Sequence, residues 1–168
     1  MLATGSVAER AAQQDLRALC AAHPLDLYTL TRVVRIEQGA VPHSHPILTL
    51  NTRYRGEPDR LLATYLHEQM HWKVKAADGP ALVAAVQAAF PELPTEPLLG
   101  ARDRTSTFLH VAVCYGEVQA LRDLLGRDRA ERAIEAAAAE RYRALYELAI
   151  RRAAEVARVL HPWFAPLA

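Results

Sequence analysis

The feature that most constrains this chain is one amphipathic segment, residues 58 to 77, which reads PDRLLATYLHEQMHWKVKAA. Its opening proline suits the first turn of a helix, and the DGP that follows at 78 to 80 is typical of a helix end. Leu62, Leu66 and Met70 recur at a spacing of four and form an apolar stripe. A helix with such a stripe is expected to pack against the rest of the core.

Three polar residues of this helix have the spacing of a metal site. His67 and His71 are four residues apart, so they lie on one helical face, one turn apart. Two such imidazoles can bind one zinc ion at about 2.0–2.1 Å, whereas Glu68 is offset by one residue and projects beside the ion. There it can take a proton from water whose pKa zinc lowers to about 7. This H-E-x-x-H spacing predicts two zinc ligands and a general base, although the same letters also occur on ordinary amphipathic helices.

A catalytic zinc site needs a third protein ligand, and the segment 105 to 125 offers three candidates. His110, Cys114 and Glu117 lie at i, i+4 and i+7, so they share one face of a predicted helix. His110 and Glu117 are about 10.5 Å apart along the helix axis, so one ion is not expected to bind both. A buried cysteine is more often a small hydrophobic residue. The residues alone leave the choice open, and the polar groups could instead pair with each other or face solvent.

The other patterns predict an α+β domain in which helices are in the majority. The β-branched segment 25 to 36 and residues 47 to 54 are typical of strands. Ser6 and Glu9 have the spacing of a helix capping box. A length of 168 residues is typical of one domain, expected to span residues 1 to 168. The predicted helices cover residues 6–22, 58–77, 80–90, 103 or 105 to 125, and 129–160.

Charge and hydropathy argue against two classes of partner. The net charge is +1, so no overall field favours nucleic acid or a membrane surface. Glutamates alternate with the arginines of residues 122 to 158, as on a solvated helix face. No apolar run approaches the roughly 18 residues of a membrane-spanning helix. The two cysteines form no disulfide framework, and Glu9 and Asp15 lie where a signal peptide would be apolar, so a cytoplasmic location is expected.

A predicted strand, the H-E-x-x-H helix and a later helix with a glutamate together resemble the zincin metallopeptidases, and among them the minimal gluzincin domains. The resemblance covers roughly residues 25 to 125 and implies His67, His71 and Glu117 as zinc ligands and Glu68 as general base. The sequence WKVKAADGP after His71 lacks the glycine-then-histidine continuation of the metzincins. YGEVQAL around Glu117 departs from the gluzincin N-E-x-x-S-D pattern, so this ligand rests on helix position. A carboxylate ligand would also lower the charge of a buried zinc site from +2 to +1.

The same resemblance implies a fold and a class of substrate. The fold would be zincin-like, with a small antiparallel or mixed sheet packed on the motif helix and a second helix that bears a ligand. The substrate would be a peptide or protein that pairs in extended form with residues 46 to 54, although a plain sheet edge is the alternative. With Glu117 as the ligand, His110 would contact the substrate or stabilise the oxyanion.

Four other side chains are candidates for the same site. Tyr142 and Tyr146 are four residues apart on the last predicted helix, where a phenol could stabilise an oxyanion or simply pack against the helix face. His43 and His45 flank Ser44 in a loop, where they could bind a second metal ion, contact substrate or have no role.

The sequence leaves three hypotheses for the whole chain. The first is a zinc-dependent hydrolase, most simply a peptidase, in which Glu68 takes a proton from water and returns it to the leaving amine. The second is a non-catalytic, metal-stabilised regulatory or interaction domain that keeps the zincin fold. The third is a helical scaffold without metal. A cleft with an open metal position distinguishes the first two, metal content tests the third, and the oligomeric state stays open.

Overall fold

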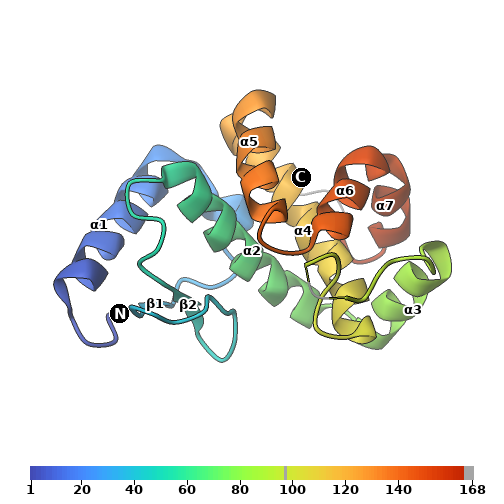
Figure 1. Cartoon of the computed structure of the whole chain (residues 1–168), viewed down its shortest axis with the longest axis horizontal. Helices are drawn as coiled ribbons and strands as arrows, with labels where there is room; N and C mark the ends of the chain where they lie inside the picture. Colours follow the sequence, from blue (N-terminus) through green and yellow to red (C-terminus); the bar gives the residue numbers. More distant parts are fainter. Residues whose placement is uncertain (97, 165–168) are drawn as a thin grey trace.

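The structure is a computed structural model that describes residues 1–96 and 98–164, and it is mostly helical (Figure 1). A small two-stranded sheet lies beside the helices, so the predicted helical majority is confirmed. In this described part of the chain, no helix has the length and apolar character needed to cross a membrane. The elements in chain order are α1 (Val7–Ala22), the 3₁₀ helix η1 (Leu25–Tyr28), β1 (Val34–Ile36), β2 (Leu48–Leu50), α2 (Pro58–Ala76), α3 (Gly79–Ala89), α4 (Arg104–Leu125), α5 (Arg127–Ala138), α6 (Arg143–Arg151) and α7 (Ala153–Leu160).

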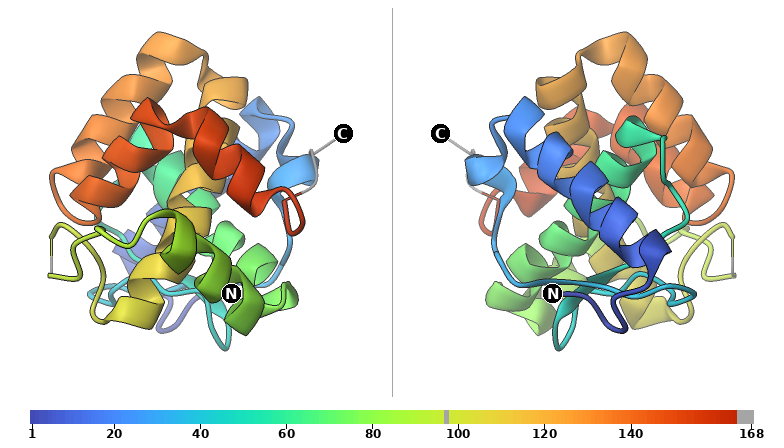
Figure 2. Two further views of the ribbon diagram at one scale, coloured as in Figure 1. Left: turned by 90° about the vertical axis from the view of Figure 1, so that its right-hand side faces the viewer. Right: turned by 90° about the vertical axis from the view of Figure 1, so that its left-hand side faces the viewer.

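Helix α4 lies at the centre of the helical part. Its N-cap is Asp103, whose carboxylate accepts the Ser106 backbone N–H at 2.7 Å, and its C-cap is Gly126, which has φ +73°. α4 contacts α2, α3, α5, α6 and α7 (Figures 1 and 2). α2 contacts α1, η1 and β2 as well, so it joins the N-terminal elements to the helices.

α2 and α4 approach each other closely where they cross. Met70, from the predicted apolar stripe of α2, is fully buried there. A Cβ atom on Gly116 of α4 would lie 2.6 Å from the Met70 sulfur, far inside van der Waals contact. The absence of a side chain at Gly116 therefore permits this crossing. Leu62 and Leu66 are also fully buried, which confirms that the stripe faces the core.

The sheet is smaller than predicted, and its strands are parallel. β1 and β2 run in the same direction, so the antiparallel arrangement implied by the resemblance is wrong for these strands. The connection between them returns along the other side of β2, where His43 and Thr49 form an antiparallel bridge. Of the strand predicted at 47–54, only Leu48–Leu50 pairs with β1. β2 contacts α2, so the small sheet does pack on the motif helix.

Most of the strand predicted at 25–36 is not a strand, since its first residues form η1 and only its last three pair in the sheet. The reason lies in α2. The buried Gln69 side-chain oxygen accepts the backbone N–H groups of Leu30 and Thr31 at 2.8 and 2.9 Å. The Gln69 amide nitrogen donates to the Thr31 carbonyl at 2.8 Å. One amide side chain thus satisfies backbone groups that a longer strand would pair in a sheet.

The single helix predicted over 129–160 is in fact α5, α6 and α7. The first break is at Tyr142, which has a left-handed backbone with φ +59° and ψ +29°. The next two N–H groups, of Arg143 and Ala144, donate to the carbonyls of residues 98 and 99 at 2.9 and 3.0 Å. The unpaired N–H groups at the start of α6 are therefore satisfied by a distant loop. No glycine or proline marks this break in the sequence.

Candidate metal centre

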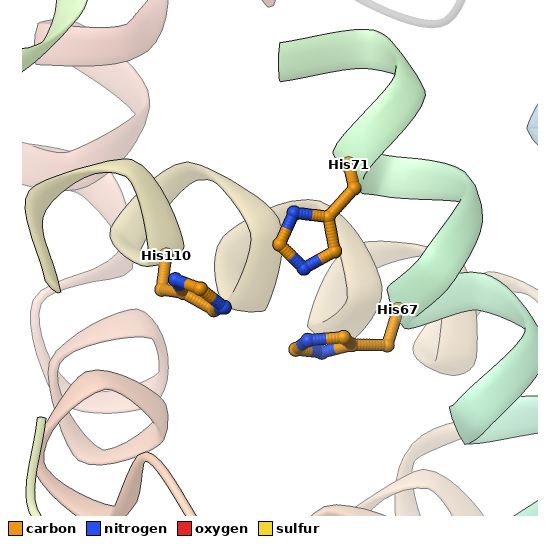
Figure 3. A group of neighbouring side chains, drawn as sticks. All are labelled: His67, His71 and His110. Atoms are coloured by element: carbon orange, nitrogen blue, oxygen red, sulfur yellow. The ribbon is translucent and has the colours of Figure 1, made fainter. Parts of the chain in front are cut away.

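Three histidines from α2 and α4 form one group at the crossing of these helices. One ring nitrogen from each of His67, His71 and His110 lies within 4.8 Å of the other two. The rings of His67 and His71 come from successive turns of α2 and point toward His110 on α4 (Figure 3). Three imidazole nitrogens at this separation can hold one metal ion.

Two of these imidazoles are held by hydrogen bonds that leave the second ring nitrogen free. The Nδ1–H of His67 donates to Oε2 of Glu117 at 2.9 Å. The Nδ1–H of His110 donates to the backbone carbonyl of Ser106, one turn earlier in α4, at 2.7 Å. In both rings Nε2 then keeps its lone pair, which is the form that binds a metal.

The pKa values of His71 and His110 also suit metal binding. Burial lowers the pKa of His71 to about 2, and the charges of neighbouring histidines act in the same direction. Burial likewise lowers the pKa of His110 to about 4. Burial also opposes a charge on His67, but the hydrogen bond and charge of Glu117 outweigh it and raise the pKa of His67. His71 and His110 are therefore neutral near pH 7, as ligands must be.

Glu117, the third ligand implied by the resemblance, is not part of this group. Its carboxylate is 1% exposed and accepts hydrogen bonds from His67 Nδ1 at 2.9 Å and from the Tyr146 hydroxyl at 2.7 Å. It therefore lies one hydrogen bond behind His67, where it orients that ring. His110, expected to be free for substrate, occupies the position beside His67 and His71 instead. Cys114, the other candidate, is fully buried outside the group, and burial raises the pKa of its thiol.

Glu68 lies beside the three histidines on the wall of a cavity. The cavity has a volume of about 1060 Å³ and is also lined by His67, His71 and His110. Glu68 is 6% exposed, and burial raises the pKa of its carboxyl, although the charges of His67 and His43 act in the opposite direction. A raised pKa brings a carboxylate closer to the range in which it can both accept and release a proton near pH 7.

The two tyrosines reach the site in different ways. The Tyr142 ring stacks on His67, with ring centroids 5.4 Å apart, and on His110, with centroids 4.4 Å apart. Its left-handed backbone is unusual for a bulky residue, and such strain is concentrated at functional sites. The Tyr146 hydroxyl is already bonded to Glu117, so Tyr146 supports the centre from behind.

The loop histidines line the same cavity but do not join the group. His45 stacks on Trp72 of α2, with ring centroids 4.4 Å apart, and Trp72 Nε1–H donates to the Ser44 carbonyl at 3.0 Å. The Nδ1–H of His43 donates to the Val41 carbonyl at 2.9 Å. These contacts attach the loop to the motif helix rather than to a second metal site.

The edge of β2 is not free at its centre to pair with a peptide. The Thr49 N–H donates to the His43 carbonyl at 2.7 Å, and the His43 N–H donates to the Thr49 carbonyl at 3.1 Å. The other edge of β2 pairs with β1. A peptide that enters the cavity must therefore be recognised by contacts other than strand pairing at Thr49.

Sequence reasoning missed one residue of the cavity, Arg141. It lines the cavity with His67 and Glu68, although it is 73 residues beyond Glu68 in the chain. The only local signal was its place next to Tyr142, and a continuous helix was expected over both residues.

Comparisons with known proteins found no matching family model, no matching curated protein and no matching solved structure.

Proposed function

We propose that this chain is a zinc-dependent hydrolase of peptide bonds with a zincin-like site. The observation that carries the proposal is the group formed by His67, His71 and His110, whose ligand atoms lie within 4.8 Å of one another on the wall of a cavity. His110 replaces Glu117 as the third ligand in this assignment, because Glu117 is bonded to His67 and Tyr146.

The donor set fits a catalytic zinc ion. Three imidazoles with one open position are typical of catalytic zinc sites, whereas structural zinc sites have four protein ligands and are rich in cysteine. Among the residues that the structure describes, no fourth histidine, cysteine, aspartate or glutamate joins the group. The buried Glu117 carboxylate, one hydrogen bond away, compensates part of the charge that three neutral ligands leave on the ion.

The chain supplies the proton transfers and the orientation. A zinc ion held by His67, His71 and His110 would supply a Lewis acid for the water and for the carbonyl group of the substrate. Glu68 takes the proton from the attacking water and gives it to the nitrogen of the leaving amine, and its raised pKa suits both steps. Glu117 and the Ser106 carbonyl fix the His67 and His110 rings. The aromatic ring of Tyr142 stacks on both of those imidazole rings.

Metal analysis and one conservative variant test the proposal. The purified chain is expected to carry one zinc ion, which His67→Ala, His71→Ala and His110→Ala each lose, while the exposed control His161→Ala keeps it. Glu68→Gln should keep zinc and lose at least about 100-fold in hydrolysis of a mixed peptide library, as expected for a general base.

Other outcomes would reverse particular assignments. Zinc that survives in His110→Ala but disappears in Glu117→Ala would restore Glu117 as the ligand. A wild-type chain that holds zinc and cleaves nothing in the library would be the non-catalytic, metal-stabilised domain.

A further inference from the structure

Arg141 is one of two cations of the cavity, with Lys75, that pair with no carboxylate among the residues that the structure describes. Arg141 is exposed and lines the cavity beside His67 and Glu68. Within the residues that the structure describes, no carboxylate oxygen lies within 4.0 Å of its guanidinium, since it takes part in none of the ion pairs. A guanidinium in a cavity is suited to bind a carboxylate through two parallel hydrogen bonds.

The other arginines of the cavity are paired. Arg53 bonds Glu140 at 3.0 Å, and Arg60 bonds the same carboxylate. Arg102 pairs with Asp103 at 3.1 Å. Among the described arginines of the cavity, only Arg141 thus has its charge available for a ligand; Lys75, the other unpaired cation, lies over the Trp72 ring at 5.6 Å and lacks the planar fork that binds a carboxylate through two hydrogen bonds.

Arg141 is also held in place from both sides. Glu140, directly before it, is held by Arg53 and by the Tyr54 hydroxyl, each at 3.0 Å. Tyr142, directly after it, stacks on two histidines of the metal centre. The Arg141 N–H itself bonds the carbonyl of residue 137 at 3.1 Å. The backbone at Arg141 is therefore fixed, so that ligand binding has to order only its side chain.

The position of Arg141 relative to Glu68 indicates which end of a substrate it would meet. Arg141 lines the same cavity as Glu68, and it directly precedes Tyr142, whose ring stacks on two of the three histidines next to Glu68. In the proposed reaction Glu68 protonates the leaving amine. An anion bound at Arg141 therefore belongs to the leaving side of the substrate. In a peptide, the anion nearest to a leaving amine is the carboxylate of the C-terminal residue.

We propose that Arg141 binds the C-terminal carboxylate of a peptide substrate, so that the chain acts as a carboxypeptidase. This inference rests on the proposed hydrolase function. One water is consumed: its oxygen forms a bond to the scissile carbonyl carbon, the C–N bond breaks, and the proton passes through Glu68 to the amine. The products are a peptide shortened by one residue and a free amino acid.

The test uses two matched pools of N-acetylated tetrapeptides, one with a free C-terminal carboxylate and one with a carboxamide. The full-length chain loaded with zinc is expected to release single C-terminal residues from the acid pool, with kcat/KM about 10- to 100-fold above the amide pool. Arg141→Ala should raise KM for the acid pool by a similar factor, change kcat little, and leave the amide pool unaffected. Arg102→Ala, which removes a paired arginine of the same cavity, is the control and should behave like wild type.

A binding measurement separates failure of this inference from failure of the proposed function. The metal-free chain should bind the acid pool more tightly than the amide pool by calorimetry, and Arg141→Ala and Arg141→Gln should both abolish the difference. If the chain holds no zinc and cleaves nothing, the proposed hydrolase fails, but a preference for acid that depends on Arg141 still supports the carboxylate site. Equal binding of the two pools by wild type would overturn it, as would a preference that survives in both variants.

Discussion

At the scale of single residues, hydrogen-bond partners distinguish three buried carboxylates. Glu9 is fully buried and accepts backbone N–H groups of Thr4, Gly5 and Gln38. Glu117 accepts from one histidine and one tyrosine. Glu68 accepts no hydrogen bond from the described residues, so its oxygens stay available to water and substrate. A carboxylate that is already saturated with donors serves structure, whereas one that is not can move protons.

The role of Glu117 can be tested by zinc affinity. Glu117→Ala is expected to weaken zinc binding about 10- to 100-fold, the usual effect of losing a group that orients a ligand imidazole. Competition with a chromophoric chelator measures the affinity. Tyr146→Phe, which removes the second donor to the same carboxylate, should have a smaller effect. An unchanged affinity in Glu117→Ala would show that the hydrogen bond to His67 does not support the centre.

Glu9 predicts a specific acid sensitivity. Burial by itself raises the pKa of this carboxyl, but the hydrogen bonds from Thr4, Gln38 and Gly5 outweigh it and lower the pKa from 4.5 to about 2. The folded state therefore binds the proton less readily than the unfolded state. The resulting stability is present above pH about 4.5 and is lost as the pH falls toward 2. Glu9→Gln should flatten the fall in the free energy of unfolding over this window, measured by urea denaturation, whereas the exposed Glu96→Gln should reproduce the wild-type curve.

At the scale of helices, the ends and the crossing of α2 and α4 determine the site. The ends of α4 are set by nearby residues of the sequence, since Asp103 caps its first turn and Gly126 caps its last. The crossing depends on two facing positions, Gly116 and Met70. Because the three histidines of the candidate metal centre lie on both helices, any change in the separation of the helices also moves His110 relative to His71.

Gly116→Ala tests this dependence. Alanine at a helix interior usually adds about 1 kcal/mol of stability relative to glycine. Here its Cβ would lie 2.6 Å from the Met70 sulfur, and overpacking of this kind costs about 1–3 kcal/mol. The clash should prevail, so the variant is expected to lose stability and to bind zinc more weakly. Gly79→Ala, where a Cβ meets nothing within 4 Å, is the matched control. A stabilised Gly116→Ala with wild-type zinc affinity would contradict the close crossing.

At the scale of the whole molecule, the candidate metal centre joins helices that are distant in sequence. α2 carries two of the three histidines and α4 the third, and α5, α6 and α7 all pack against α4. A ligand that binds only the folded chain stabilises it by mass action. Zinc should therefore contribute to the stability of the whole fold.

Zinc removal measures that contribution. With free zinc about 1,000-fold above its Kd, binding adds about 4 kcal/mol. For a chain of this size that corresponds to roughly 10 °C in Tm. Calorimetric scans before and after treatment with a chelator should show this drop, and His110→Ala should show none. A wild-type Tm that is the same with and without chelator would argue against a bound ion.

The sequence by itself determined the features that neighbouring residues encode. The bounds of α2 and α4, the apolar stripe, and the placement of His67, Glu68 and His71 on α2 follow from helical periodicity and helix ends. Only the tertiary structure decided which residue of α4 joins them. His110 and Glu117 are about 10.5 Å apart on one helix face, so the choice depends on where α2 crosses α4.

The tertiary structure also decided the shape of the C-terminal third. A continuous helix over 129–160 would be about 48 Å long, and nothing in its local sequence forbids it. The chain breaks at Tyr142 because carbonyls of residues 98 and 99 bond the first N–H groups of α6, and because the Tyr142 ring stacks on two histidines from other helices. Those partners are distant in sequence. A local sequence pattern carries no information about contacts between distant residues.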